Sequence, residues 1–339
     1  MVFRALDFTE VEYCPLCGQD RFKQYDQVVD TLITELNRFL PATQPRLSEI
    51  INQRQKCLAC GLVFLAPRLT AESLALIYQL WYQYAFQQIF ADVTYIQERR
   101  KEFVTYHLAM LQQVALTQGK LLDVGCGSGI FLDEAKKRGW TTYGIELNAE
   151  AATAGNKNYA VNIHSGTITS VLTPADRFDA ITLFDYLEHS MQPGQDLATL
   201  VSHLNSNGVM LLRVPNLNGL QAQLMQNKWL AVIANHLSYF SAPVLVNALQ
   251  QLGLTVEKIQ AGNYQSEFDI LRRRWSWLKN KINHKPMQSE CGGNSPVDAY
   301  TAKAKLKRFF YSLFIEQVDQ VGGWINRGNN LMVIARKKN

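Results

Sequence analysis

Apolar and polar residues alternate along the chain in blocks that predict a layered α/β protein. From Lys120 to about Ala261, short apolar runs typical of buried strands are separated by stretches with helical periodicity. The expected strands are 121–124, 141–146, 161–163, 178–184, 208–214, 254–260 and 331–335, and the expected helices are 130–138, 149–158, 194–203 and 243–251. This alternation predicts a mostly parallel sheet covered by helices on both faces.

Three regions flank this block. Residues 1–68 contain two cysteine pairs, and residues 69–118 carry apolar side chains at helical spacing. Residues 262–329 break the alternation with a basic, aromatic stretch at 272–281 and an expected helix at 299–321. We therefore expect a domain at 1–68, a helical linker or lid at 69–118, and a third domain at 119–339 with a helical insertion at about 262–329.

The composition is that of a folded protein and limits its function only weakly. Of the 339 residues, 47% are hydrophobic and 19% charged, and the length allows one large domain with attachments or two to three domains. The net charge of +5 permits an anionic partner without requiring one. We find no signal peptide and no run of roughly 20 apolar residues, so we expect a cytoplasmic protein without a transmembrane segment.

A glycine loop follows the first expected strand of the block. Gly125, Gly127 and Gly129 allow the chain to turn sharply just before a helix, whose N-terminus attracts anionic groups. Ile130 stands where the dinucleotide fingerprint GxGxxG has its third glycine, which disfavours NAD. Glu146, at the end of the next strand, can accept hydrogen bonds from ribose hydroxyls. The pattern predicts a nucleotide-like ligand.

Together with the segment from Phe178 to His189, these residues resemble the class I S-adenosylmethionine-dependent methyltransferases of the methyltransferase domain 23 type. The Leu187-Glu188-His189 ending is similar to the subgroup that methylates small molecules, and residues 208–216, 236–241 and 252–254 fit its order and spacing. The resemblance covers about residues 14–336. It implies a Rossmann-like, seven-stranded, mostly parallel, doubly wound sheet, with S-adenosyl-L-methionine as cofactor.

The resemblance also implies individual roles. The first strand and the loop would hold the methionine end of the cofactor, and the end of the second strand would hold its ribose. The residues after the third strand would border its adenine, and the end of the fourth strand would flank the cofactor. An acidic residue that is usual near the adenine is missing, so backbone contacts are expected there. The implied residues are Asp123, Gly125, Cys126, Gly127, Gly129, Glu146, Gly166, Thr167, Ile168, Phe184 and Asp185.

Two CxxC pairs stand near the N-terminus. Cys14 and Cys17, and Cys57 and Cys60, are each followed by glycine, and together they supply four thiolates for a tetrahedral, structural zinc. A redox dithiol and unligated cysteines are the alternatives. The region around residues 60–68 resembles the zinc-binding N-terminal portion of some sugar and natural-product methyltransferases. The lone Cys126 and Cys291 are not expected to be ligands.

The candidates for a general base lie after the expected strands. His189 is first, His236 second and Tyr239 third, with Asp185 as a further possibility. The alternative for each histidine is a structural role. A divalent metal bridging Asp185, Glu188 or His189 is another alternative, because some related O-methyltransferases use one.

The resemblance implies a small-molecule acceptor: a sugar, a nucleotide-sugar or a natural product, methylated on oxygen or carbon. The aromatic segment 81–95 and the insertion 262–329 would frame its pocket. The basic stretch 272–281 has three possible roles: a solvated helix face, a binding site for an anionic or glycan-linked acceptor, or a contact with RNA or a membrane surface. The chain lacks the Asn/Asp-Pro-Pro-Tyr/Phe segment of enzymes that methylate base amines, which disfavours nucleic acid. An RNA-modifying methyltransferase and a catalytically silent subunit are the alternative functions.

Overall fold

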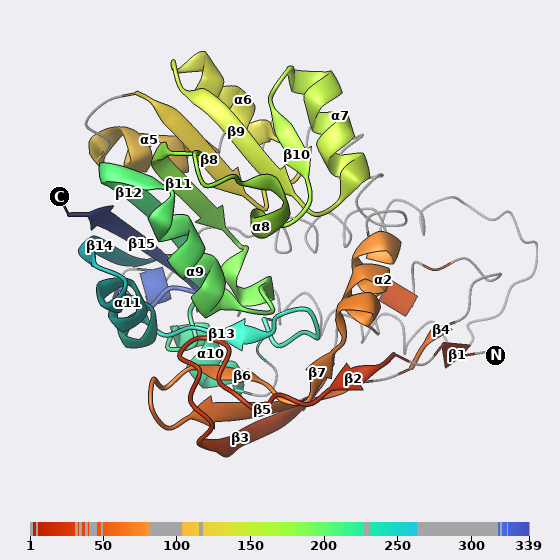
Figure 1. Cartoon of the computed structure of the whole chain (residues 1–339). Coiled ribbons are helices and arrows are strands. Elements are labelled where there is room, and N and C mark those ends of the chain that lie inside the picture. The colour runs from red at the N-terminus through yellow and green to blue at the C-terminus, as the bar shows by residue number, and fades with distance from the viewer. Residues whose placement is uncertain are drawn as a thin grey trace, which may run out of the picture.

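The structure is a computed structural model of the chain, shown in Figure 1. The residues it describes are 3–4, 6–30, 33, 36–37, 40, 46–48, 50–81, 104–114, 118–226, 229, 231–262, 318, 321–323 and 325–338. Three expected features lie outside these ranges: all but the first residue of the aromatic segment 81–95, the basic stretch 272–281 and most of the helix expected at 299–321. Among the described helices, none has the length and apolar character needed to cross a membrane.

The larger sheet contains seven strands in the order β10-β9-β8-β11-β12-β15-β14. The first five strands of this order are mutually parallel, whereas β15 runs antiparallel to both β12 and β14. This confirms the predicted seven-stranded, mostly parallel sheet. The bounds are β8 (Lys120–Val124), β9 (Thr141–Glu146), β10 (Ile163–Ser165), β11 (Phe178–Phe184), β12 (Leu204–Pro215), β14 (Leu254–Gly262) and β15 (Asn330–Lys337).

Helices cover both faces of this sheet (Figure 1). Neighbouring strand residues enter different cores: Ala180 and Leu211 pack with α5 and α6, while Ile181 and Leu212 pack with α9 and α11. This separation confirms the doubly wound arrangement, because successive strand residues point to opposite faces. The helix bounds are α5 (Thr105–Val114), α6 (Ile130–Lys137), α7 (Ala149–Tyr159), α8 (Ile168–Val171), α9 (Pro193–Ser202), α10 (Leu220–Met225) and α11 (Ala242–Gln251).

A smaller, four-stranded sheet has the order β13-β6-β5-β3, with bounds β3 (Phe22–Val29), β5 (Ile51–Cys57), β6 (Val63–Leu65) and β13 (Ser238–Tyr239). Strand β13 comes from the second half of the chain, yet its two residues pair with Phe64 and Val63 of β6. Shorter elements of the N-terminal region are β1 (Phe3–Arg4) paired with β4 (Arg46–Leu47), β2 (Phe8–Thr9) paired with β7 (Arg68–Leu69), and helix α2 (Ala71–Trp81).

The two sheets share one hydrophobic core. Cys57 and Phe64 of the small sheet are buried in the same cluster as Leu183 of the large one. The N–H of Gly194, in α9, donates to the carbonyl oxygen of Pro15 at 3.1 Å. Packing and strand pairing therefore cross the boundary expected at residue 68, and the expected division into domains stays a prediction.

Strand β10 begins two residues later than the sequence pattern predicts. Val161 is buried, at 8% exposure, and so contributes an apolar signal, but the pairing with β9 starts at Ile163 opposite Gly144. The side-chain amide of Asn156 bonds both the N–H and the C=O of Ile163 at 2.8 Å. These two bonds hold the start of this edge strand against α7.

Candidate functional site

The glycine loop joins β8 to α6 at the carboxyl end of the large sheet. Gly125, Gly127 and Gly129 have φ angles of 72°, 54° and 76°, in the left-handed region that glycine adopts without strain. The N–H groups of Gly125 and Cys126 donate to the carbonyl oxygen of Ile145 at 2.8 and 3.2 Å, which fastens the loop to β9. Among the residues that the structure describes, no atom would lie within 4 Å of a Cβ placed on Gly127, so this part of the loop has open space beside it for a ligand.

Glu146, the last residue of β9, faces this loop. Its Oε2 accepts a hydrogen bond from the N–H of Gly127 at 2.8 Å, and its Oε1 accepts one from the N–H of Asn148 at 2.9 Å. The carboxylate thus lies between the glycine loop and the start of α7, and the ribose-binding role of Glu146 stays a prediction.

The remaining polar candidates surround the same strand ends. Asp123 is buried, at 4% exposure, and accepts a hydrogen bond from Oγ1 of Thr182 at 2.7 Å. The N–H of Gly166 donates to the carbonyl oxygen of Glu146 at 3.0 Å, and Thr167 caps the short helix α8. Gly166 and Thr167 therefore lie beside the end of β9, which separates β10 from β8 and its loop, and their place beside the adenine stays a prediction.

Of three other predicted cofactor residues, Phe184 and Ile168 are buried and Cys126 is partly buried. The ring of Phe184 packs against His107 and Phe131, with centroids 4.5 and 5.1 Å away, and Ile168 is 2% exposed. Burial raises the pKa of Cys126, which keeps its thiol neutral. These residues can offer a ligand their backbone more readily than their side chains.

Asp185 compensates a buried positive charge. Nε of Arg213 donates to Oδ1 of Asp185 at 2.8 Å, and the guanidinium NH2 donates to Oδ2. The Arg213 side chain is 0% exposed and the Asp185 side chain 22%. Since this pairing occupies both carboxylate oxygens, Asp185 is positioned by Arg213, and its predicted place beside the cofactor stays a prediction.

Tyr186 was not among the predicted site residues, yet it covers the loop. A Cβ on Gly125 would lie 3.0 Å from Cδ2 of Tyr186. The Tyr186 hydroxyl donates to Oδ2 of Asp196 at 2.9 Å. Burial, together with the charge of Asp196, raises the pKa of Tyr186, so this side chain is a neutral wall of the site.

The structure brings His189 and His236 together. His189 ends the short 3-10 helix η3 (Leu187–His189), and the two rings lie 4.6 Å apart between centroids at an angle of 76°. Nδ1 of His189 lies 2.7 Å from the carbonyl oxygen of Asn235 and 3.1 Å from the hydroxyl of Tyr78, in α2. Nδ1 of His236 lies 2.8 Å from the carbonyl oxygen of Ala231.

Burial sets the protonation of this cluster. It lowers the pKa of His189 and of His236 below the ordinary value of 6.5. It raises the pKa of Glu188 well above its ordinary range, with the charge of Asp185 as a further cause. Burial and the nearby Glu188 raise the pKa of Tyr78. The two imidazoles are therefore neutral at neutral pH and able to accept a proton or bind a cation.

Tyr239 has the contacts of a core residue. It is 1% exposed, and the guanidinium carbon of Arg54 lies 4.8 Å from its ring centroid. The ring of Trp229 is 6.2 Å away, and burial raises the pKa of Tyr239. These contacts are with Arg54 and Trp229 rather than with His189 or His236. The catalytic role of Tyr239 stays a prediction.

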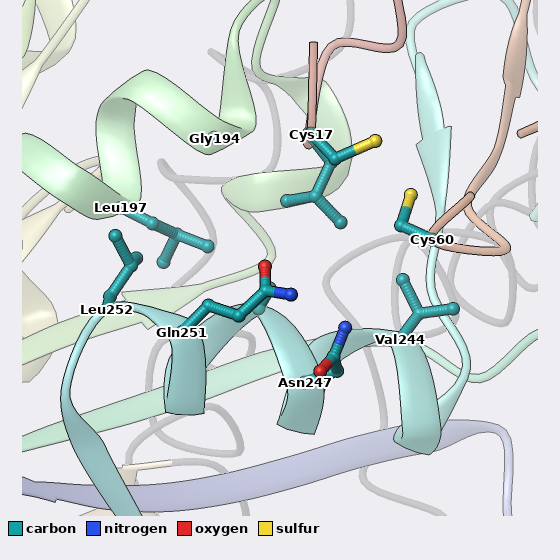
Figure 2. A pocket seen from close by; sticks show the side chains of 10 residues that line it. Cys17, Cys60, Gly194, Leu197, Val244, Asn247, Gln251 and Leu252 are labelled. Atoms are coloured by element: carbon teal, nitrogen blue, oxygen red, sulfur yellow. The ribbon is translucent and has the colours of Figure 1, made fainter. Parts of the chain in front are cut away.

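The four paired cysteines form one group. The Sγ atoms of Cys14 and Cys60 are 3.6 Å apart, those of Cys17 and Cys57 are 3.7 Å apart, and all four lie within 4.8 Å of one another. Four sulfurs about 2.3 Å from a tetrahedral zinc would be roughly 3.8 Å apart. Figure 2 shows the sulfurs of Cys17 and Cys60 turned toward each other beside a pocket between this region and helices α9 and α11. The group fits zinc.

Without a cation the four thiols cannot all ionise. The hydrogen bond from Cys60 lowers the pKa of Cys14 to about 5, and the same bond raises the pKa of Cys60. Burial raises the pKa of Cys17 to about 11. A divalent ion would supply the missing positive charge and displace the remaining protons.

The comparisons with known proteins agree with this geometry. A family model described as a methyltransferase domain matches residues 95–259, a span that includes the glycine loop, Glu146 and His189. This span is just under half of the chain. The predicted resemblance to methyltransferases is confirmed for these residues.

Two curated proteins and one solved structure are similar to this chain. The chain is 32% identical over 121 residues to a ubiquinone biosynthesis O-methyltransferase of Histophilus somni (strain 2336), covering 32% of this chain and 51% of the relative. It is 28% identical over 113 residues to the enzyme of the same name from Coxiella burnetii (strain Dugway 5J108-111), covering 32% and 48%. A SAM dependent methyltransferase from Archaeoglobus fulgidus has 17% identity and a TM-score of 0.45, covering 73% of this chain and 100% of that one. The chain spans about half the length of the curated relatives it matches.

Three residues of the candidate site were not predicted from the sequence: Tyr78, Tyr186 and Arg213. Arg213 gave a signal, because a charged residue within the apolar run of β12 needs a buried counter-charge. Tyr78 lies on a helix that was correctly predicted, but its contact with His189 spans 111 residues of sequence. No local pattern could have found that contact.

Proposed function

We propose that this chain transfers a methyl group from S-adenosylmethionine to a small-molecule acceptor. The observation that carries the proposal is the link between loop and strand: Glu146 accepts a hydrogen bond from the N–H of Gly127 next to open space. Glu146 would hold the ribose hydroxyls, and Asp123 with the loop would hold the methionine end. The matched family is the independent support.

The chemistry is an in-line displacement. An oxygen or carbon of the acceptor attacks the methyl carbon, and the carbon–sulfur bond breaks with its electron pair staying on sulfur. The acceptor loses a proton in the same process. Alignment in a closed site supplies much of the acceleration. The neutral His189 and His236 are the groups placed to receive the proton, directly or through a bound intermediary.

We propose a sugar, a nucleotide-sugar or a natural product as the acceptor. Support comes from the resemblance of the cysteine region to the N-terminal portion of sugar and natural-product methyltransferases. Two relatives named ubiquinone biosynthesis O-methyltransferase add support for a small molecule and for oxygen as the methylated atom. An anionic or glycan-linked acceptor would engage the basic stretch 272–281, which lies outside the described residues.

We further propose that the four cysteines bind one structural zinc. All four coordination positions would be filled by protein, so the ion would hold the two CxxC turns together and take no part in the reaction. The first turn packs closely against α9, where a Cβ on Gly194 would lie 2.2 Å from the carbonyl oxygen of Leu16, so an ion that holds this turn would also hold its contact with α9.

Transfer of a radiolabelled methyl group tests the proposed activity. The full chain is incubated with labelled S-adenosylmethionine and either a small-molecule fraction or total RNA from cells. The account predicts label in small molecules with the wild type and little with Glu146→Ala. Label in RNA alone, or equal transfer by both proteins, contradicts it.

A further inference from the structure

Arg68, in the short strand β7, is a buried cation beside the loop that follows η3. The residue is 8% exposed, and its Nη1 donates to the carbonyl oxygen of Met191 at 2.8 Å. Met191 comes two residues after His189. Helix α2 follows β7 directly (Figure 1), and its Tyr78 places a hydroxyl 3.1 Å from Nδ1 of His189. The segment 68–78 therefore contacts this loop at two points.

The other edge of the Arg68 guanidinium has no partner among the described residues. Its Nε is buried and makes no hydrogen bond there. Its Nη2 makes none either, and it is not among the atoms shut off from solvent. Nε and Nη2 lie on the same side of the planar group, where an arginine binds a carboxylate or a phosphate through two parallel hydrogen bonds. A buried donor without an acceptor is costly, and an anion at this edge would remove that cost.

Two other buried arginines show what the same edge holds elsewhere in this fold. Arg54 donates through Nε and Nη2 to the carboxylate of Asp26, and Arg213 donates through the same two atoms to Asp185. These two arginine side chains are 2% and 0% exposed. Arg68 is also buried, yet no carboxylate of the described residues pairs with it, and burial lowers its pKa. A guanidinium that is buried without a counter-charge is unfavourable, so the comparison points to an anion that is supplied from outside the chain.

The position of Arg68 favours an anion of the acceptor over the carboxylate of the cofactor. The charge of Glu146 raises the pKa of Tyr78, whereas burial is the one cause that shifts the pKa of Arg68 among the described residues. Arg68 is thus less exposed than Tyr78 to the charges of the proposed cofactor site. Its contact with Met191 instead places it beside the loop that carries His189, the first candidate for the base.

We propose that Arg68 binds an oxyanion of the methyl acceptor, a phosphate or a carboxylate, through Nε and Nη2. The oxyanion site rests on the unpartnered edge alone, and only its assignment to the acceptor rests on the proposed function. The anionic group would anchor the acceptor at β7, on the side of the loop that Met191 marks. A neutral acceptor would leave the charge of Arg68 unpaired, so the site would select anionic molecules.

Anion titration of the full chain tests the site. Calorimetry measures the binding of inorganic phosphate and, separately, of acetate. Arg68→Met keeps an unbranched apolar side chain without the charge. Arg177→Met is the matched control, because the exposed Arg177 also donates through Nη1 to carbonyl oxygens, those of Pro174 and Asp176. We expect at least one of the two anions to bind the wild type and the control, and to bind Arg68→Met at least about 10-fold more weakly, because hydrogen bonds between charged groups are lost. Absence of binding in the wild type, or equal affinity in Arg68→Met, overturns the proposal.

Nitrogen-15 NMR of the arginine side chains needs no variant and keeps the test decisive if Arg68→Met fails to fold. Buried N–H groups exchange slowly with water, so the Nε–H signals of Arg54, Arg68 and Arg213 should be observed in the wild type. Two of these arginines already hold a carboxylate, and we expect the added anion to shift the third signal. Three signals that stay unchanged overturn the proposal.

Titration with S-adenosylmethionine separates the two possible sources of the oxyanion. We expect Arg68→Met to bind this cofactor with the affinity of the wild type. A loss as large as that for the inorganic anion would assign the edge to the cofactor carboxylate and overturn the acceptor assignment. A wild type that binds the anion but not S-adenosylmethionine would contradict the proposed function and leave the oxyanion site in place.

Discussion

The buried ion pair between Asp185 and Arg213 predicts a large effect for a small substitution. Asp185→Asn removes the counter-charge of a guanidinium that is 0% exposed, while its shape and its tolerance of the left-handed φ of 54° are kept. Removing one partner of a buried pair costs about 3–5 kcal/mol. Because the Asp185 side chain is 22% exposed, water can partly replace it, and we expect a loss near the lower end, about 3 kcal/mol.

Equilibrium unfolding in urea, followed by far-UV circular dichroism, measures this loss. Glu134→Gln is the control, because Glu134 pairs with Lys137 and Arg138 on the surface, where such pairs contribute less than about 1 kcal/mol. Adding Arg213→Met to Asp185→Asn should restore part of the stability, since no unpaired charge then remains in the core. A loss for Asp185→Asn no larger than that of the control refutes the reasoning.

Three further predictions follow from the same contacts. Gly129→Ala places a Cβ 2.7 Å from Cδ1 of Ile163, so it should cost clearly more stability than Gly253→Ala, where φ is also positive but the space is open. The shared backbone cost is about 1–2 kcal/mol, and urea unfolding of both variants measures the difference. Cys14→Ser should reduce bound zinc by one equivalent and make the N-terminal region more sensitive to protease, as metal analysis and limited proteolysis would show. Burial lowers the pKa of His189 and His236, so just below pH 6.5 the unfolded chain binds more protons than the folded one. The free energy of unfolding should therefore be highest above pH 6.5 and fall as the pH decreases.

Each of these has a clear contrary outcome. Equal losses for the two glycine variants would show that the loop relaxes around the new methyl group. Unchanged zinc content in Cys14→Ser would remove this residue from the ligand set. For the pH prediction, the unfolding free energy is measured between about pH 5 and pH 7.5. A free energy that does not change with pH, or a pH dependence that is undiminished in His236→Gln, would contradict the assignment of neutral, partly buried histidines.

The order of the strands and helices followed from the sequence where the elements are regular. Strand β11 was predicted with both ends correct, because its apolar run is bounded by polar residues and lies in the middle of the sheet. The three glycines of the loop and the carboxylate at the end of the next strand could also be predicted, because the local geometry at these positions requires those residue types.

The remainder depends on contacts that are distant in sequence. The two-residue strand β13 is too short for a periodic signal, and it exists because β6 provides a partner edge. His189 and His236 were selected separately as candidates, but only the fold places their rings 4.6 Å apart. Tyr239 looked similar in sequence, beside His236, and the pairing of β13 instead places it against Arg54 in the small sheet.

Calorimetric titration with S-adenosylmethionine tests the central claim most directly. We expect the wild type to bind one equivalent, and Glu146→Ala to bind at least about 10-fold more weakly, because two hydrogen bonds to a charged group are lost. Glu150→Ala, which changes an exposed acid in the first turn of α7, should bind like the wild type. Absence of binding in the wild type, or equal affinity in Glu146→Ala, would contradict the account.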